Sequence, residues 1–117
     1  MLLRFMDNIK NDAYYLNKMI EDWEFMILNT KGKSQNEIES NQLLVDSIMF
    51  RLIQVYENYN KLSELFKVNN SNIPCQAIKG MRNKIVHDYG IVNLDIVYDT
   101  VINSIPDLLK KLKKAKI

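Results

Sequence analysis

The side chains of this sequence that could carry out chemistry cluster between Gly80 and Gly90, a stretch that contains the only histidine among 117 residues. Arg82 is a cation, Asn83 a neutral hydrogen-bonding group, His87 a titratable base and Tyr89 an aromatic phenol. In its neutral form, His87 could take the proton from an RNA 2′-hydroxyl, while Arg82 stabilises the charge that builds on the phosphate oxygens. This combination predicts cleavage of a phosphate ester without a metal.

The same stretch lacks the ligands of a metal centre, and it also fits a purely structural role. It holds no pair of acidic residues and no second His or Cys, so we predict neither a metal nor a cofactor. A surface arginine, a hydrogen-bonded histidine at a helix end and a packing tyrosine would give the same pattern. The spacing of Arg82 and His87, taken alone, favours that structural interpretation.

The spacing of the motif also limits which side chains can meet. On a helix that turns about 100° per residue, Asn83 and His87 lie one turn apart on the same face, and Tyr89 lies roughly 20° from Arg82. Arg82 and His87 lie about 140° apart, so they cannot converge on one small group from a single regular helix. Either the helix unwinds near Tyr89, or a second copy of the motif lies alongside. The spacing thus indicates a homodimer with a shared cleft.

Length and composition indicate one all-α domain that covers residues 1–117. The chain is 47% hydrophobic and 26% charged, which is ordinary for a globular core. Three glycines and two prolines are too few for the turns of an all-β fold. Cys75 is the single cysteine, so no intramolecular disulfide can form. Without a signal peptide or a membrane-spanning apolar run, we expect a cytoplasmic protein that does not enter membranes.

The first half of the chain is predicted to form two long antiparallel helices. The first begins near Phe5 and ends at residues 31–33. Ser34 and Glu37 have the spacing of a capping box, so a second helix starts there, and no residue up to Lys67 would break it. The apolar stripes step by three and four residues: Phe5, Ile9, Ala13, Leu16, Ile20, Trp23 and Ile27, then Leu44, Ile48, Leu52, Val55, Tyr59, Leu62 and Phe66.

The motif is predicted to lie on a third helix. Residues 69–72 form a polar turn, and Pro74 fits the first helical turn that follows it. Gly90 suits a left-handed cap at the end of this helix, which places His87 in the last turn.

The C-terminal part is predicted to contain a fourth helix and a kink. Asn93 can cap the fourth helix, whose buried stripe is Leu94, Val97, Val101 and Ile105. Pro106 interrupts it, with Ser104 as a new N-terminus for a kinked segment or a short fifth helix. The predicted product is an up-and-down bundle of four to five helices.

Charge is distributed unevenly along the chain, although the net charge of +2 is small. Acidic residues concentrate in the first predicted helix, whereas lysines concentrate at the C-terminus. Such a lysine cluster can be a solvated helix end that interacts with the helix dipole, or it can steer RNA toward the protein. The cluster comprises Lys110, Lys111, Lys113, Lys114 and Lys116.

The motif Arg82-Asn83-x-x-x-His87-x-Tyr89 resembles the Arg-x4-His-x-Tyr motif of HEPN-domain proteins of the HepT toxin group. Residues 52–63 are also similar to the second-helix block of that group and keep its glutamate, at Glu57. Further segments in family register are residues 73–74, 78–80 and 96–98.

This resemblance implies a homodimeric all-α bundle with a metal-independent endoribonuclease site built from Arg82 and His87 of both subunits, supported by Asn83. It implies that the protein is the toxin of a toxin–antitoxin pair whose antitoxin is a minimal nucleotidyltransferase. It also implies that this partner can modify Tyr89 with AMP.

The chain departs from the family pattern near Glu57 and after Pro74. Tyr56 stands where the family usually has Gly, Asn58 where Ala is common, and Cys75 where Trp is common. These differences leave the motif intact but affect the expected groove shape and substrate choice. Two other functions stay open: a non-catalytic accessory subunit that presents nucleotide or substrate to a nucleotidyltransferase, and a structural helical dimer with a vestigial motif.

Overall fold

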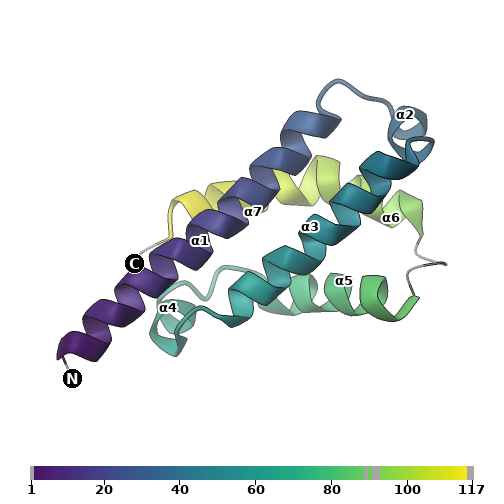
Figure 1. The fold of residues 1–117 in the computed structure, drawn as a ribbon. Coiled ribbons are helices and arrows are strands. Elements are labelled where there is room, and N and C mark those ends of the chain that lie inside the picture. Colours follow the sequence, from purple (N-terminus) through teal and green to yellow (C-terminus); the bar gives the residue numbers. More distant parts are fainter. Residues whose placement is uncertain (1, 89, 91–92, 116–117) are drawn as a thin grey trace.

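The computed structural model describes residues 2–88, 90 and 93–115, and the side chains of residues 11–88, 90, 93–100 and 102–115. Every regular element in these ranges is helical, which confirms the predicted all-α class (Figure 1). None of the helices described there combines the length and the apolar character needed to cross a bilayer.

Helix α1 (Leu2–Thr30) forms as predicted and runs antiparallel to α3 (Gln42–Asn60), which lies alongside it (Figure 1). The chain leaves α1 through Gly32, whose φ of +74° lies in the left-handed region that glycine adopts without steric strain. The two long antiparallel helices predicted from the sequence are therefore present, although the second is shorter than expected.

The buried face of α1 is rotated from the predicted stripe. Met19 and Met26 are fully buried, whereas Ile20 and Ile27 are only half-buried. Helix α1 packs against both α3 and α7 (Ile105–Lys113), and flexible methionine side chains suit the irregular space where neighbouring helices meet. Trp23 lies in the core as predicted. Two further members of the stripe, Phe5 and Ile9, lie outside the described side chains.

The prediction of one continuous helix up to Lys67 is wrong. The segment divides into α2 (Gln35–Glu39), α3 and α4 (Glu64–Asn69). The capping box at the start of α2 is confirmed, since the Ser34 Oγ accepts from the Glu37 backbone N–H at 3.2 Å and Glu37 accepts from the Ser34 backbone N–H at 3.2 Å.

Side-chain caps cause the two breaks. The Asn41 side chain accepts from the backbone N–H of Leu44 at 3.1 Å and starts α3, and the Ser63 side chain accepts from that of Phe66 at 3.1 Å and starts α4. Asn and Ser compete with helical hydrogen bonds in this way, so they favour helix ends over interiors. The apolar stripe survives both breaks: Ile48, Leu52, Val55, Tyr59, Leu62 and Phe66 are buried, and Leu44 is half-buried.

Two polar clamps join α1 to the segment that contains α3 and α4. The buried carboxylate of Asp12 accepts hydrogen bonds from the backbone N–H of Ser63 at 2.8 Å and from its hydroxyl at 2.6 Å. Farther along α1, Asp22 pairs with Nη1 of Arg51 at 2.7 Å. Burial raises the pKa of the Asp22 carboxyl, although the hydrogen bond and charge of Arg51 oppose that rise. The clamps fix how α1 and α3 are aligned along their length.

The C-terminal half contains α5 (Cys75–Asp88), α6 (Leu94–Asp99), the π-helical segment Thr100–Ser104 and α7. Asn93 caps α6 as predicted, since its side chain accepts from the Asp95 backbone N–H at 2.8 Å. The left-handed cap expected at Gly90 stays a prediction, because the preceding residue, Tyr89, lies outside the described residues. Val97 and Ile105 of the predicted stripe are buried.

The predicted new N-terminus at Ser104 is confirmed, since a separate helix, α7, begins directly after it at Ile105. Ser104 has helical backbone angles and its side chain makes no cap hydrogen bond. Instead, the π-helical segment carries the helix through, with the Ile105 backbone N–H bonded to the carbonyl of Thr100. The wider turn accommodates Pro106, which has no N–H to donate and would clash in a regular α-helical turn.

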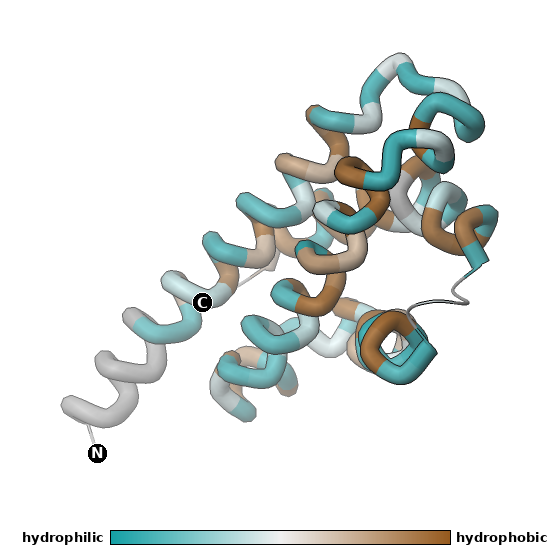
Figure 2. Tube along the Cα trace, turned by 45° about the vertical axis from the view of Figure 1, so that its right-hand side comes forward, coloured by the Kyte–Doolittle hydropathy of each residue, from teal (hydrophilic) through white to brown (hydrophobic). Residues whose placement is uncertain are grey.

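The helices enclose one apolar core. Helices α1 and α3 form the front of the bundle in Figure 1, with α5 behind α3 and α7 behind α1. Helix α5 crosses the direction of α3 in Figure 1 and is seen nearly end-on in Figure 2 while α3 runs across the view, so the arrangement is more splayed than the predicted up-and-down bundle. Figure 2 shows that α5 is hydrophobic on the side toward the other helices and hydrophilic on its outer side. The core therefore sets how the motif-bearing helix is rotated.

We predict that Asp12→Ala lowers the free energy of unfolding by about 2 kcal/mol, because it removes a charged acceptor and leaves the Ser63 N–H without its partner. Urea unfolding followed by circular dichroism measures the change. The matched control is Asp107→Ala on α7, which removes an exposed ion pair with Lys111 and should change stability by under about 1 kcal/mol. Equal effects from the two variants would contradict the proposed clamp.

Candidate active site

Helix α5 presents the motif along the edge of the bundle. Ile78 and Ile85 are buried against the core and fix the rotation of the helix, because residues about two turns apart share one face. This rotation places Arg82 on the flank that faces α3. His87 lies in the last turn, as predicted, and its side chain is exposed.

Arg82 is oriented by three neighbouring groups. Its Nη2 forms an ion pair with Oε1 of Glu57 on α3 at 3.2 Å, and its Nη1 donates to Oδ1 of Asn83 at 3.2 Å. The centre of the guanidinium lies 5.5 Å from the centroid of the Tyr56 ring. The Arg82 side chain is 28% exposed and that of Glu57 40%. Ion pairs this open to water contribute about 1 kcal/mol or less, so a phosphate can compete with Glu57 for the guanidinium.

One donor of Arg82 is unused. Its Nε–H is buried and has no acceptor among the residues that the structure describes. A buried donor without a partner costs about 1–3 kcal/mol. Because this donor is shielded from solvent, a phosphate would approach the partly exposed end of the guanidinium, whose planar fork can bind a phosphate through two donors. Arg82 therefore keeps capacity for an anionic ligand.

Arg82 and His87 do not face a common point within one chain. Arg82 turns toward α3, whereas His87 lies on the outer side of α5. Along a helix, five residues correspond to an axial separation of about 7.5 Å. Asn83 lies between Arg82 and His87 in sequence, is half-buried, and accepts a hydrogen bond from Arg82. Tyr89 lies outside the described residues.

The outer face of α5 is open at Gly80. Gly80, His87 and Val86 are exposed, and Val86 keeps 44% of its surface exposed. A Cβ added at Gly80 would meet no atom within 4 Å. This face can therefore accept close approach by another helix or by a nucleic acid.

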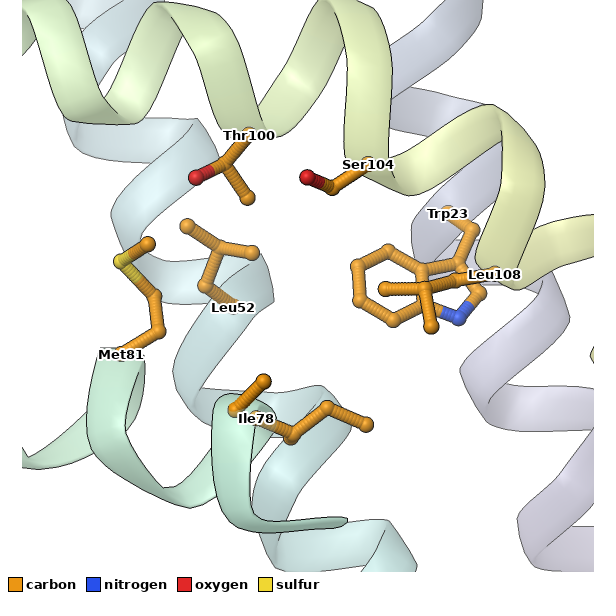
Figure 3. A pocket seen from close by; sticks show the side chains of 8 residues that line it. Trp23, Leu52, Ile78, Met81, Thr100, Ser104 and Leu108 are labelled. Carbon is orange, nitrogen blue, oxygen red and sulfur yellow. The ribbon is translucent and has the colours of Figure 1, made fainter. Parts of the chain in front are cut away.

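An apolar hollow of about 110 Å³ lies behind the motif, between α1, α3, α5 and the C-terminal helices (Figure 3). Trp23, Leu52, Ile78 and Met81 line it, and the hydroxyls of Thr100 and Ser104 lie along one rim. The Thr100 hydroxyl already donates to the Ile96 carbonyl at 2.7 Å. The lining lacks charged groups, so this hollow does not suit a phosphate.

Cys75, one of the departures from the family pattern, packs beside Tyr59 where α5 begins. Burial raises the pKa of the Tyr59 phenol to about 12, and a hydrogen bond with Cys75 acts in the same direction. Cys75 is thus part of the contact between α3 and α5.

The C-terminal lysines resemble a solvated helix end. Lys111 pairs with Asp107 on the same helix at 3.2 Å, and Lys113 pairs with Glu24 on α1 at 3.5 Å. Lys110 and Lys114 are exposed, and Lys116 lies outside the described residues. Ion pairing of two lysines favours a structural role for this cluster over RNA steering.

Within the part of the chain that the structure describes, no three His, Cys, Asp or Glu side chains come together as a metal site would require.

An all-α bundle whose motif-bearing helix carries Arg82 and His87 is the architecture expected of HEPN-related proteins. A family model described as "Ribonuclease HepT-like" matches residues 16–115. A candidate ribonuclease of Caldanaerobacter subterraneus subsp. tengcongensis is 30% identical over 106 residues, which cover 91% of this chain and 95% of that protein. A candidate ribonuclease of Methanocaldococcus jannaschii is 23% identical over 105 residues, covering 90% of this chain and 87% of that protein. No solved structure matches the chain significantly.

This chain therefore belongs to the HepT-like ribonuclease family, which confirms the resemblance seen in the motif.

Sequence spacing could not identify the partners of Arg82. The family resemblance includes Glu57 and Tyr56, but it gives no contact between them and the motif. They lie on a different helix, so no helical periodicity connects them with Arg82. The one feature of the sequence that points to a role for Glu57 outside the core is its position on α3, away from the buried apolar stripe.

Proposed function

We propose that this protein is a metal-independent endoribonuclease. The observation that carries the proposal is that one helix of a HepT-like ribonuclease holds both a partly exposed Arg82, oriented by Glu57, and an exposed His87. In the proposed reaction His87 accepts the proton of a 2′-hydroxyl, and the 2′-oxygen attacks the adjacent phosphorus. The bond from phosphorus to the 5′-oxygen breaks, which gives a 2′,3′-cyclic phosphate and, after protonation by water, a 5′-hydroxyl. Arg82 stabilises the charge on the phosphate oxygens.

The active enzyme is proposed to be a homodimer. Arg82 and His87 point to different sides of α5, so one chain does not bring them to one phosphate. A second chain that approaches along the flank of α5 where Arg82 faces α3 would place its own His87 near the Arg82 of the first chain. Val86 supports this arrangement, because it lies one turn from Arg82 on the same flank and keeps an exposed apolar surface that a second chain would cover.

The biological role is proposed to be that of a toxin whose antitoxin is a minimal nucleotidyltransferase. Control by this partner would act through Tyr89, which follows the helix that carries Arg82. AMP attached to its phenol would add a phosphate that can pair with the guanidinium and fill the space that RNA needs.

We predict that His87→Ala lowers the rate of RNA cleavage by about 10²–10⁴-fold, because it removes the general base. The melting temperature should stay unchanged, since the side chain is exposed. Gel analysis of a labelled RNA, with and without chelator, measures the rate. Gln76→Ala is the matched control, since this residue is also exposed on α5 but lies three turns away. If His87→Ala cleaved RNA at the normal rate, His87 would not be the general base. If the wild-type protein folded but did not cleave RNA, the alternative of a non-catalytic accessory subunit would be favoured.

We predict that light scattering at micromolar concentration gives the mass of a dimer, and that mixing two inactive variants restores activity. In a mixture of Arg82→Ala and His87→Ala, half of the dimers are mixed, and each mixed dimer keeps one intact composite site. The expected activity is about one quarter of the wild-type value. A monomer, or a mixture that stays inactive although the subunits exchange, would contradict a shared site.

Co-expression with a cognate minimal nucleotidyltransferase is predicted to increase the intact mass by AMP groups and to silence cleavage. Tyr89→Phe should prevent the increase and keep the ribonuclease active in the presence of the partner. Tyr98→Phe is the control, because Tyr98 is half-buried on α6 and should not be the acceptor. An adduct on Tyr98, or modified protein that cleaves at the normal rate, would count against this mechanism.

A further inference from the structure

A second hollow of the molecule lies on the outer face of the bundle, between α1 and α3, and has a volume of about 490 Å³. We call it the α1–α3 groove. The groove is separate from the contacts that α1 and α3 make with α7 and α5. Glu24, on the other flank of α1, pairs with Lys113 of α7. Glu57, farther round α3, pairs with Arg82 of α5. The lining residues are Tyr14, Tyr15, Lys18, Asp22, Phe50, Arg51, Gln54, Asn58 and Lys61.

Aromatic rings are exposed along both walls of the groove. Tyr14 is 57% exposed on α1, and Phe50 is 58% exposed on α3. Tyr15 packs edge-on against Tyr14, with ring centroids 5.2 Å apart and an interplanar angle of 82°. The core does not use the exposed rings, which offer flat faces to a ligand. Stacking of a nucleic-acid base on such a ring contributes about 1–3 kcal/mol per base and tolerates any base.

The groove also carries excess positive charge. Arg51 is neutralised by Asp22, the single carboxylate in the lining, and its guanidinium lies 4.0 Å from the centroid of the Phe25 ring. Lys18 and Lys61 remain, and their ammonium groups lie 5.7 Å and 5.5 Å from the centroids of the Tyr14 and Tyr15 rings.

The two lysines can exchange their present contacts for phosphates. Lys18 pairs with Glu21 at 3.5 Å, but both side chains are about half exposed or more, at 46% and 65%. Such a pair is weak in water. Lys61 has no carboxylate within ion-pair distance among the described side chains. Cations beside exposed rings, together with the amides of Gln54 and Asn58, match a chain of phosphates and unstacked bases.

Helix α3 connects this groove to the motif. Gln54 and Lys61 line the groove, and they lie three and four residues from Glu57, the partner of Arg82. Residues at these spacings are neighbours on a helix surface. A strand in the groove therefore lies one row of side chains from the proposed catalytic arginine.

We propose that the α1–α3 groove binds single-stranded RNA, with Tyr14 and Phe50 stacking on bases and Lys18 and Lys61 binding phosphates. This inference rests on the proposed ribonuclease function and assigns a substrate-binding site outside the motif. Single-stranded RNA is the occupant because stacking on the rings requires bases that a duplex hides.

Binding to a fluorescent oligouridylate of about twelve nucleotides tests the proposal, a length within the range that single-strand sites cover. All proteins carry His87→Ala, so that the RNA stays intact during anisotropy titrations. The double variant Tyr14→Ala with Phe50→Ala should bind about 10- to 100-fold more weakly. The conservative pair Tyr14→Phe with Phe50→Tyr should bind normally, because both rings remain.

The lysines are tested by the dependence of affinity on salt. Lys18→Gln with Lys61→Gln should reduce the slope of log affinity against log salt by about 1.4, because each phosphate contact on a single strand contributes about 0.7. The matched controls are Leu28→Ala and Lys31→Gln, which are exposed on or just after α1 outside the groove. Melting temperatures verify that every variant folds.

The outcomes separate this proposal from the ribonuclease function. If the groove variants bind RNA as tightly as the parent while the protein with His87 still cleaves, the groove proposal is wrong and the function stands. Equal binding to duplex RNA would also overturn the groove proposal, as would groove variants that change the oligomeric mass, because the groove would then be a contact between subunits. A wild-type protein that binds the oligouridylate through the groove without ever cleaving RNA would instead refute the ribonuclease function.

Discussion

The packing of α1 against α3 is the contact on which the rest of the structure depends. Met19, Trp23 and Met26 of α1 and Ile48 and Val55 of α3 are almost completely buried. Each side chain of this size contributes about 1.5–3 kcal/mol when it leaves water. Helices α5 and α7 then cover the two free flanks of this pair. Apolar burial alone does not fix how two helices are aligned, so the two polar clamps between the helices supply that specificity.

Helix α3 controls both surfaces to which we assign a function. Its flank toward α5 carries Tyr56 and Glu57, which orient Arg82. Its flank toward α1 carries Arg51 and Lys61, which line the groove. Because an α-helix distributes neighbouring residues around its axis, residues 56 to 61 serve both surfaces within two turns. A change in the rotation of α3 would therefore disturb the arginine and the groove together.

Arg82 is oriented within one chain, but His87 does not face it. Arg82 is compensated by Glu57 and contacts Asn83, while His87 lies on the opposite side of the helix surface. An arginine held by a weak, partly exposed ion pair is ordered at little energetic cost, and it can still exchange its carboxylate for a phosphate. This arrangement is consistent with a site that forms only when a second chain supplies the missing group, as the proposed homodimer requires.

The sequence by itself determined the all-α class, α1, the caps at Ser34 and Asn93, and the position of His87 in the last turn of α5. These features depend on local hydrogen bonds and on helical periodicity, which neighbouring residues encode. Only the tertiary structure decided the features that depend on residues far apart in the chain. The break before α4 is stabilised by Asp12 from α1, and Arg82 is oriented by Glu57 of α3. Such contacts join separate helices, and no repeat within one helix can predict them.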